Sequence, residues 1–217
     1  MTDMGEISWI LGIRVTRDWR AGWIALSQEK YILEVLDSER FGKSDARPIA
    51  TPTLANKRLT KLPLPEIEAK SYQSAVGALM YQMLGTRPDT AYAVATLRHH
   101  AANPGAEHQR ALDRTFKYLR GTSDCELVFQ RGMPGGETLN GYVDADWASD
   151  INDRKSTSGF VFMLAGGAIC WSLKKQASVA LSIVNVPGNP RVLFSYPYPY
   201  PSKPLSVLRG KGSRLNG

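Results

Sequence analysis

Proline residues are distributed so unevenly that they divide the chain and limit what each part can form. Four of the thirteen prolines lie within residues 48–65, and six lie within residues 183–217. Proline has no backbone N–H and a fixed φ, so a proline-rich stretch builds neither a helix nor a central strand. Together with a change from helical to strand patterning after Gly121, this predicts four segments, at residues 1–66, 67–122, 123–182 and 183–217. The last segment, which includes the string SYPYPYPSKP, is expected to be a disordered tail.

The first segment is predicted to hold a β-hairpin, a helix and a linker. β-Branched and aromatic residues alternate with polar ones near its start, as is typical of a strand. Ser27 is suited to cap the helix, and Glu29 follows in the first turn, where the helix dipole favours an acid. The expected elements are a strand at 7–17, a turn at 18–22, a return strand at 23–26, a helix ending near Phe41-Gly42 and an extended arm at 43–66.

The second segment is predicted to form three helices. Apolar residues recur there every three or four positions, and Pro88 is suited to the first turn of a helix. The expected helices lie at 71–84, from Pro88 onward, and at about 106–119, with Val76, Leu79, Met80, Met83, Val94, Leu97, Ala111, Leu112, Phe116 and Leu119 among their apolar positions.

After Gly121 the pattern changes from helices to strands. Strands are expected at 127–130, 139–145, 159–164 and 168–172, and the last two form a hairpin around Gly166-Gly167. Cys170 alternates with Trp171 in this hairpin and is interpreted as a small core residue. Helices and strands thus occupy separate blocks, which predicts an α+β fold class.

Composition and charge narrow the class of protein. Hydrophobic residues make up 43% of the 217 residues, and no run of eighteen apolar residues is present, so no membrane-spanning helix is expected. The two cysteines argue against a disulfide framework and fit an intracellular compartment, cytoplasm or nucleus. A net charge of +7 hints at a polyanionic partner. Five basic residues and no acidic ones lie in residues 183–217, so most of this excess belongs to the tail.

An acidic cluster follows the strand expected at 139–145. Asp144, Asp146, Asp150 and Asp153 supply oxygen ligands of the kind that Mg²⁺ prefers. Two such ions held by several carboxylates make a phosphoryl-transfer site. Asp144 and Asp146 are expected on the same face of the strand. The same residues also suit a solvated loop, and their spacing leaves both interpretations open.

Basic residues suggest contacts with nucleic acid. Arg110, Arg114 and Lys117 recur at i, i+4 and i+7 on the third expected helix, where they form one stripe that could follow a phosphate backbone. The alternative is a solvated amphipathic face, which an ion pair between Arg110 and Asp113 would support. Two further basic pairs are Arg154-Lys155 and Lys174-Lys175.

Seven strings, in order along the chain, resemble a known family. They are LGIRV (11–15), LSQEKYI (26–32), TRPDTAYAV (86–94), LRGT (119–122), GYVDADWASD (141–150), RKSTSGFVF (154–162) and WSLKKQASVALS (171–182). Together they resemble the Pol polyprotein of copia-type long-terminal-repeat retrotransposons over about residues 5–182. The resemblance implies that residues 5–60 correspond to the end of a reverse transcriptase, residues 70–122 to its helical thumb or connection region, and residues 139–182 to the first half of a ribonuclease H domain.

In that family the reverse transcriptase copies RNA into DNA, and the ribonuclease H removes the RNA of the hybrid with two divalent metals. The paired polymerase aspartates are expected upstream of this chain's start. Asp144 matches the first metal-binding aspartate of ribonuclease H, but Val186 occupies the expected position of the next ligand, a glutamate. The sequence after Val186 contains no acidic residue. The resemblance therefore implies that Mg²⁺ is an ancestral cofactor that this chain does not bind productively.

The main hypothesis is a fragment of a retrotransposon reverse transcriptase/ribonuclease H polyprotein that is catalytically inactive. Its expected partners are an RNA/DNA hybrid or other nucleic acid and the remainder of the Pol polyprotein, with no membrane. The alternative is a non-catalytic nucleic-acid-binding module that uses the basic helix and the two basic pairs. The abrupt change after Ser182 suggests a frameshift, an unspliced intron or a recombined end, and an incomplete sheet of this kind is expected to be weakly stable.

Overall fold

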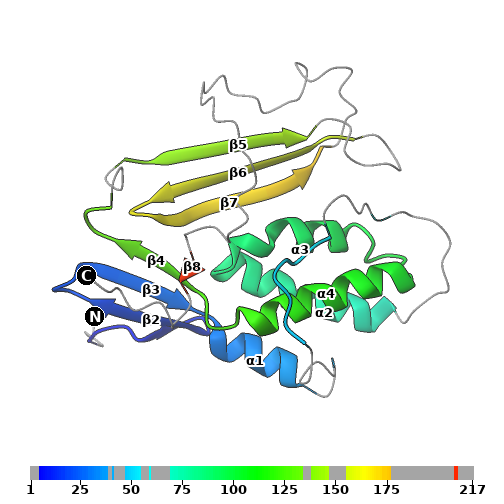
Figure 1. The fold of residues 1–217 in the computed structure, drawn as a ribbon, viewed down its shortest axis with the longest axis horizontal. Helices are drawn as coiled ribbons and strands as arrows, with labels where there is room; N and C mark the ends of the chain where they lie inside the picture. The colour runs from blue at the N-terminus through cyan, green and yellow to red at the C-terminus, as the bar shows by residue number, and fades with distance from the viewer. Residues whose placement is uncertain are drawn as a thin grey trace.

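The computed structural model describes residues 5–38, 41, 47–54, 59, 69–133, 138–146, 155–176 and 208–209. Within these residues the protein combines helices with two antiparallel sheets (Figure 1). The expected α+β class is thus confirmed at this level. Most of the predicted tail, 183–217, lies outside the described residues, and no helix in the described part is long and apolar enough to cross a membrane.

The first sheet joins the N-terminal hairpin to a strand from much later in the chain. Its strands are β1 (Trp9–Ile10), β2 (Ile13–Asp18), β3 (Trp23–Ser27), β4 (Glu126–Gln130) and β8 (Leu208–Arg209), in the spatial order β1-β2-β3-β4-β8. The predicted turn between β2 and β3 is confirmed. Asp18 Oδ1 accepts the backbone N–H groups of Arg20 and Ala21, and Gly22 has a φ of 70°.

The single strand expected at 7–17 is wrong, because the chain reverses at Leu11-Gly12. These residues have φ values of 48° and 71°, and the reversal places Ile10 opposite Ile13. The Tyr81 hydroxyl of the second helix donates a hydrogen bond to the Leu11 carbonyl and holds the turn against that helix. A contact with a distant residue therefore accompanies a left-handed conformation that leucine seldom adopts.

The helices pack around one hydrophobic core. They are α1 (Glu29–Asp37), α2 (Ala69–Gly85), the short 3₁₀ helix η1 (Pro88–Thr90), α3 (Ala91–Arg98) and α4 (Ala106–Gly121). The three helices expected in residues 67–122 are confirmed. The fully buried members of the core come from all four α-helices and are Ile32, Leu36, Tyr72, Ala75, Val76, Leu79, Val94, Leu97, Leu112, Phe116 and Leu119.

Helix α1 ends at Asp37, earlier than the predicted Phe41-Gly42. The backbone becomes extended at Ser38, and the Ser38 hydroxyl donates a hydrogen bond of 2.7 Å to the Val35 carbonyl. Phe41 still packs on the core, since its ring stacks on Phe116 with centroids 5.7 Å apart. At the other end, Ser27 Oγ accepts the Glu29 N–H at 3.3 Å.

The second sheet is formed by three consecutive strands. They are β5 (Asn140–Asp146), β6 (Thr157–Leu164) and β7 (Gly167–Lys175), paired antiparallel in the order β5-β6-β7. One face packs on the rest of the protein through Val161, Met163 and Trp171, which contact a small core around Leu127 and Ala168. In addition, Trp171 Nε1 donates a hydrogen bond of 3.1 Å to the Met83 carbonyl of α2.

Cys170 is exposed, so its predicted place in the core is wrong. Cys170 pairs with Phe162, whereas Trp171 pairs with Val161, and successive residues of a strand point to opposite faces. The face that carries Trp171 is the one packed on the rest of the protein. On the opposite side of the second sheet Phe160 and Ile169 are 38% and 47% exposed, so part of its apolar surface is left uncovered.

Candidate functional site

Asp144 lies near the end of β5, at the edge of the second sheet. It is exposed and stands opposite Gly159 of β6. Asp146 is the last residue of β5, but its side chain lies outside the described residues, as do Asp150 and Asp153. Of the predicted acidic cluster, the structure therefore gives a described side-chain position for Asp144 alone.

The described residues do not provide a donor set for Mg²⁺. In this part of the chain no group of three His, Cys, Asp or Glu side chains lies close enough to hold a metal ion. A single exposed carboxylate competes poorly with water for a hard cation that normally keeps several oxygen ligands. The side chains described here thus do not fit the metal pair that the family resemblance implies.

The basic stripe on α4 divides into two exposed residues and one anchored residue. Arg110 and Lys117 are exposed. Arg114 between them is partly buried, and its guanidinium donates a hydrogen bond of 2.8 Å to Thr51 Oγ1. Asp113, the expected partner of Arg110, accepts a hydrogen bond of 2.9 Å from Gln109 Nε2. The residues predicted to follow a phosphate backbone therefore do share one helix face, with Arg114 also holding the arm at 47–54.

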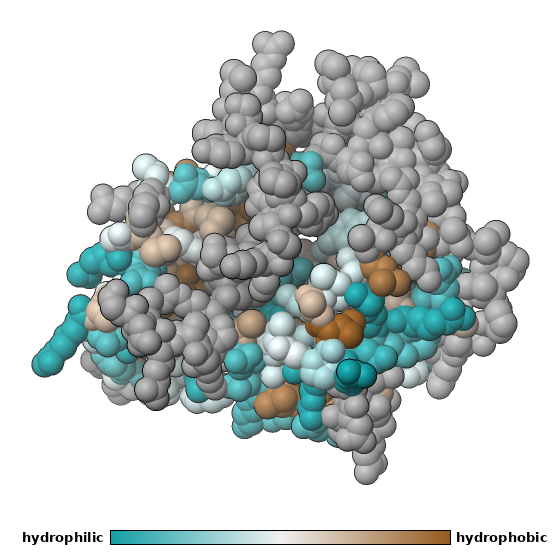
Figure 2. Space-filling model, viewed as in Figure 1, coloured by the Kyte–Doolittle hydropathy of each residue, from teal (hydrophilic) through white to brown (hydrophobic). Residues whose placement is uncertain are grey.

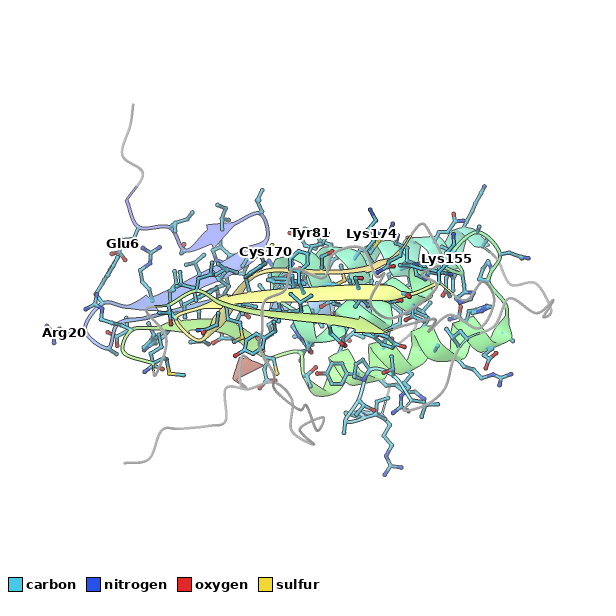
Figure 3. The ribbon with its side chains drawn as sticks, turned by 90° about the horizontal axis from the view of Figure 1, so that it is seen from above. Glu6, Arg20, Tyr81, Lys155, Cys170 and Lys174 are labelled. Atoms are coloured by element: carbon cyan, nitrogen blue, oxygen red, sulfur yellow. The ribbon has the colours of Figure 1, made fainter. Side chains whose placement is uncertain are left out.

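The lysine residues of the second sheet gather at one end of it. Lys174 stands opposite Ser158 and Lys175 opposite Thr157, where β6 begins. Lys155 precedes that strand, and Figure 3 shows it near Lys174. Lys174 is exposed, whereas Lys155 and Lys175 are half-buried. The remaining predicted residue of this group, Arg154, lies outside the described residues.

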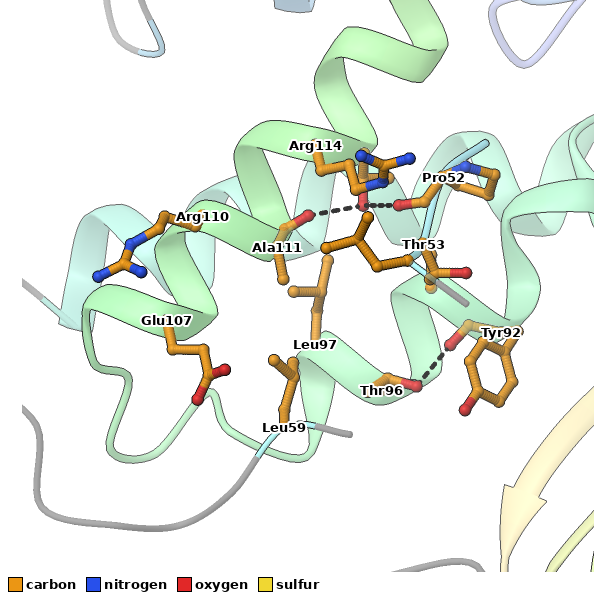
Figure 4. A pocket seen from close by; sticks show the side chains of 13 residues that line it. Pro52, Thr53, Leu59, Tyr92, Thr96, Leu97, Glu107, Arg110, Ala111 and Arg114 are labelled. Carbon is orange, nitrogen blue, oxygen red and sulfur yellow. Dashed lines mark hydrogen bonds between the residues drawn. The ribbon is translucent and has the colours of Figure 1, made fainter. Parts of the chain in front are cut away.

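A small cavity lies beside the basic stripe, between the arm at 52–54, α3 and α4 (Figure 4). Its volume is about 70 Å³. Leu59, Leu97 and Ala111 give it apolar walls, while Arg110 and Arg114 border it from α4. The surrounding surface is largely hydrophilic with small hydrophobic areas (Figure 2). The cavity therefore brings apolar surface next to two guanidinium groups.

A buried polar network, which the sequence interpretation missed, joins η1 to the end of α4. Arg87 is fully buried and makes two hydrogen bonds to the Asp89 carboxylate, of 3.0 Å and 2.8 Å. It also donates to the Thr122 carbonyl at 2.7 Å and to Thr122 Oγ1 at 2.6 Å. The Tyr118 hydroxyl donates to Asp89 Oδ2 at 2.7 Å. This cluster of Arg87, Asp89, Tyr118 and Thr122 is called the Arg87 network below.

Burial and charge act against each other on the ionisable groups of the Arg87 network. Burial works to lower the pKa of Arg87, but the Asp89 carboxylate more than compensates, so the pKa of Arg87 is raised. Burial also raises the pKa of Tyr118, and the nearby negative charge of Asp89 adds to this effect. The network is therefore held as an ion pair with a neutral phenol.

Two of the family-like strings carry the Arg87 network. The string TRPDTAYAV contains Arg87 and Asp89. The string LRGT begins directly after Tyr118 and ends with Thr122. In the sequence, the signal that could have indicated this ion pair is an arginine and an aspartate on either side of a proline. Nothing in the local pattern indicates that this pair is buried, because burial depends on how η1 meets the end of α4.

Comparison with known proteins places these features in a family. The chain is 44% identical over 189 residues to the retrovirus-related Pol polyprotein from transposon TNT 1-94 of Nicotiana tabacum. It is 37% identical over 182 residues to the corresponding polyprotein from transposon RE2 of Arabidopsis thaliana. These matches cover 84% and 82% of the chain, but only 14% and 12% of the polyproteins.

A third relative is matched over most of its own length. Over 111 residues, 51% of this chain, the identity is 50% to the secreted RxLR effector protein 161 of Plasmopara viticola, of which 77% is covered. No protein-family model matches the chain, and no solved structure does. Over most of its length the chain is similar to a segment of the Pol polyproteins of copia-type retrotransposons, which confirms the resemblance seen in its sequence strings.

Proposed function

We propose that this chain is a catalytically inactive piece of a reverse transcriptase/ribonuclease H polyprotein. The chain is similar to a segment that makes up about one seventh of the TNT 1-94 polyprotein. The ancestral activity under this proposal is RNA-templated DNA synthesis and metal-dependent cleavage of RNA in RNA/DNA hybrids. The helical region corresponds to a thumb or connection region, and β5, β6 and β7 to the first strands of a ribonuclease H-like sheet.

The observation that carries the proposal is the place of Asp144. An aspartate near the end of the first of three consecutive antiparallel strands fits the first ligand of a ribonuclease H metal site. The described residues supply no group of three potential ligands around it. In the sequence, Val186 stands where the resemblance implies a second ligand. Valine has no donor atom, so under this proposal the position of the second ligand cannot help to hold two metals.

A cleavage assay tests this inactivity. Labelled RNA annealed to DNA is incubated with Mg²⁺ or Mn²⁺ and one of three proteins: the original chain, the variant Asp144→Asn or the variant Glu34→Gln. Glu34→Gln is the matched control, because it changes an exposed carboxylate on α1. None of the three is expected to cut the hybrid faster than buffer alone. Cleavage by the chain and by Glu34→Gln, but not by Asp144→Asn, would make Asp144 catalytic and contradict the proposal.

The second candidate function is a nucleic-acid-binding module without catalysis. Arg110 and Lys117 favour it, because both are exposed on one face of α4 beside the partly exposed Arg114. Under this candidate the chain binds RNA/DNA hybrid or single strands through their phosphates, aided by Arg154, Lys155, Lys174 and Lys175. The remainder of the Pol polyprotein is a further proposed partner.

Salt-dependent binding separates this candidate from an inert fragment. Arg110→Ala and Lys117→Ala should each weaken binding to a labelled hybrid and lower the slope of log K against log[salt] by about one. Lys70→Ala, which removes an exposed lysine from α2, is the matched control and should leave both quantities unchanged. Equal affinities for all four proteins would exclude α4 as the binding face.

A further inference from the structure

The cavity between the arm at 52–54, α3 and α4 combines three features, each of which suits a different part of a nucleotide. Its walls are apolar, an exposed aromatic ring borders it, and two guanidinium groups lie on its α4 side. We propose that it receives one unpaired nucleotide of a single-stranded nucleic acid, with the base against Tyr92 and the adjoining phosphates on Arg110 and Arg114. This inference rests on the nucleic-acid-binding function proposed above and adds a residue and a substrate form to it.

Tyr92 provides the surface for the base. It lies near the start of α3 and is 57% exposed, although its neighbours Ala93 and Val94 are buried in the core. Figure 4 shows its ring at the border of the cavity. Aromatic side chains bind bases of single strands by stacking, which is tolerant of base identity since each base has a flat face. Tyr92 and the two arginines line the same cavity, which is an arrangement suited to that contact.

Arg114 provides an incompletely satisfied cation. Its guanidinium is oriented by the hydrogen bond to Thr51 Oγ1, yet its Nε is buried and has no hydrogen-bond partner in the described structure. An atom this buried is not reached by a phosphate, whereas the terminal N–H groups of a guanidinium held at the border of the cavity can donate to one. Arg110 is exposed one turn earlier on the same helix. Phosphate oxygens are acceptors that match both groups.

Charge around the cavity favours an anion. Glu107 is the acidic residue on its border, against the two arginines, and Lys117 adds a positive charge one turn beyond Arg114. The nearby Asp113 is not among the residues that border the cavity and accepts a hydrogen bond from Gln109. The positive charges therefore outnumber the negative ones where the phosphates would lie.

The size of the cavity argues for a polymer rather than a free metabolite. About 70 Å³ is far below the roughly 300–1,000 Å³ typical of small-molecule sites. Such a cavity holds the edge of one ring, while the rest of the ligand must gain its affinity outside, on the basic face of α4. A base in a duplex is stacked and paired, so the ring has to come from an unpaired nucleotide.

Binding of a labelled oligouridine and of a blunt RNA/DNA hybrid tests the proposal. Tyr92→Ala should weaken binding to the oligouridine about tenfold, with the salt slope unchanged, and leave binding to the hybrid unchanged. Tyr92→Phe keeps the ring and should bind as the original chain does. Tyr142→Ala removes another exposed tyrosine, 45% exposed on β5, and is the matched control, expected to have no effect. Circular dichroism verifies that each variant is folded.

The other outcomes are distinct. If both nucleic acids bind and Tyr92→Ala behaves as the original chain, the nucleotide site is excluded while the binding module survives. If neither binds, the module and the site are both excluded. A polyglutamate competitor that displaces oligouridine and loses its own affinity in Tyr92→Ala would assign the cavity to an acidic peptide and overturn the proposal. Should Tyr92→Ala not fold, photocrosslinking of 4-thiouridine to the original chain decides, since the crosslink must fall on the peptide containing Tyr92.

Discussion

Arg87 is the centre of a buried cluster of polar contacts, the Arg87 network. Its side chain is fully buried, and that of Asp89 is 7% exposed. The guanidinium also lies 5.6 Å from the centroid of the Tyr118 ring. In a low-dielectric interior such an ion pair is tolerated only when both members keep their hydrogen bonds. Removing one member therefore destabilises the folded state strongly.

Arg87→Met is therefore expected to lower the free energy of unfolding by about 3–5 kcal/mol, because it leaves the Asp89 carboxylate buried without its cation. Urea denaturation measures the change. Arg98→Met, at an exposed position on α3, is the matched control and should stay within about 0.5 kcal/mol of the original chain. The double variant R87M/D89L should lose less free energy of unfolding than R87M alone, because it leaves no buried carboxylate without its cation. An equal or greater loss of stability would argue against an uncompensated charge as the cause.

Two buried tyrosines predict how stability depends on alkaline pH. Burial raises the pKa of Tyr72 and of Tyr118 above the ordinary value of 10.0. Above pH 10 the unfolded chain releases phenolic protons that the folded chain retains, so stability is complete below this pH and falls above it. Each group contributes a slope of up to about 1.4 kcal/mol per pH unit. Urea titrations above pH 10 should show a shallower decline for Tyr118→Phe; an unchanged slope would exclude Tyr118 as a source.

At the scale of single elements, helix α2 shows how one residue type has opposite roles at two positions. Gly77 is exposed, and a Cβ atom added to it would meet no atom within 4 Å. At Gly85 an added Cβ would lie 2.4 Å from Gln28 Oε1. Gln28 is 1% exposed, and its Oε1 accepts a hydrogen bond from Thr86. The last residue of α2 is thus a glycine because the chain before α1 packs directly against it.

Alanine at the two glycine positions should change stability in opposite directions. Gly77→Ala is expected to stabilise the protein by about 0.5–1 kcal/mol, since alanine loses less conformational entropy in a helix. Gly85→Ala is expected to destabilise it by about 1–3 kcal/mol, because buried Gln28 must move. Thermal unfolding of the two variants measures the difference, and a stabilised Gly85→Ala would mean that Gln28 relaxes freely.

At the scale of the whole molecule, the second sheet is attached to the rest through few groups. The hydrophobic core of the helices contains eleven buried residues, whereas the hydrophobic cluster between the two sheets contains two, Leu127 and Ala168, in the described part of the chain. Trp171 adds a hydrogen bond to α2. Since local opening follows the density of buried contacts, β5, β6 and β7 should open more readily than the helices.

Hydrogen exchange tests this attachment. Amides of β6 and β7 are expected to exchange faster in Trp171→Phe, because the phenyl ring cannot donate to the Met83 carbonyl and the loss is about 1 kcal/mol. Exchange in α2 and α4 should remain slow. The matched control is Trp19→Phe, at a position that is 67% exposed and far along the chain from this sheet. Uniform acceleration across all elements would instead indicate a single cooperative unit.

Much of the local structure could be predicted from the sequence, while burial and pairing between distant segments could not. The turn at 18–22, the three helices of residues 67–122 and the hairpin of β6 and β7 follow from turn residues and apolar spacing, which act over a few positions. The reversal at Leu11-Gly12 does not follow from local sequence, because a hydrogen bond from Tyr81, seventy residues further along the chain, is made at that turn. Cys170 was placed in the core because alternation alone does not say which face of a strand will be covered.

The sequence by itself determined the family, the α+β class and the identity of the residues proposed to act, namely Asp144 and the basic side chains of α4. Only the tertiary structure decided that β4 pairs with β3, that Arg87 and Asp89 form a buried ion pair, and that Tyr92 borders the same cavity as Arg110 and Arg114. Local patterns follow from interactions within one turn or one strand. Pairing, burial and cavities arise where segments distant in sequence meet, and their free energies belong to the folded chain as a whole.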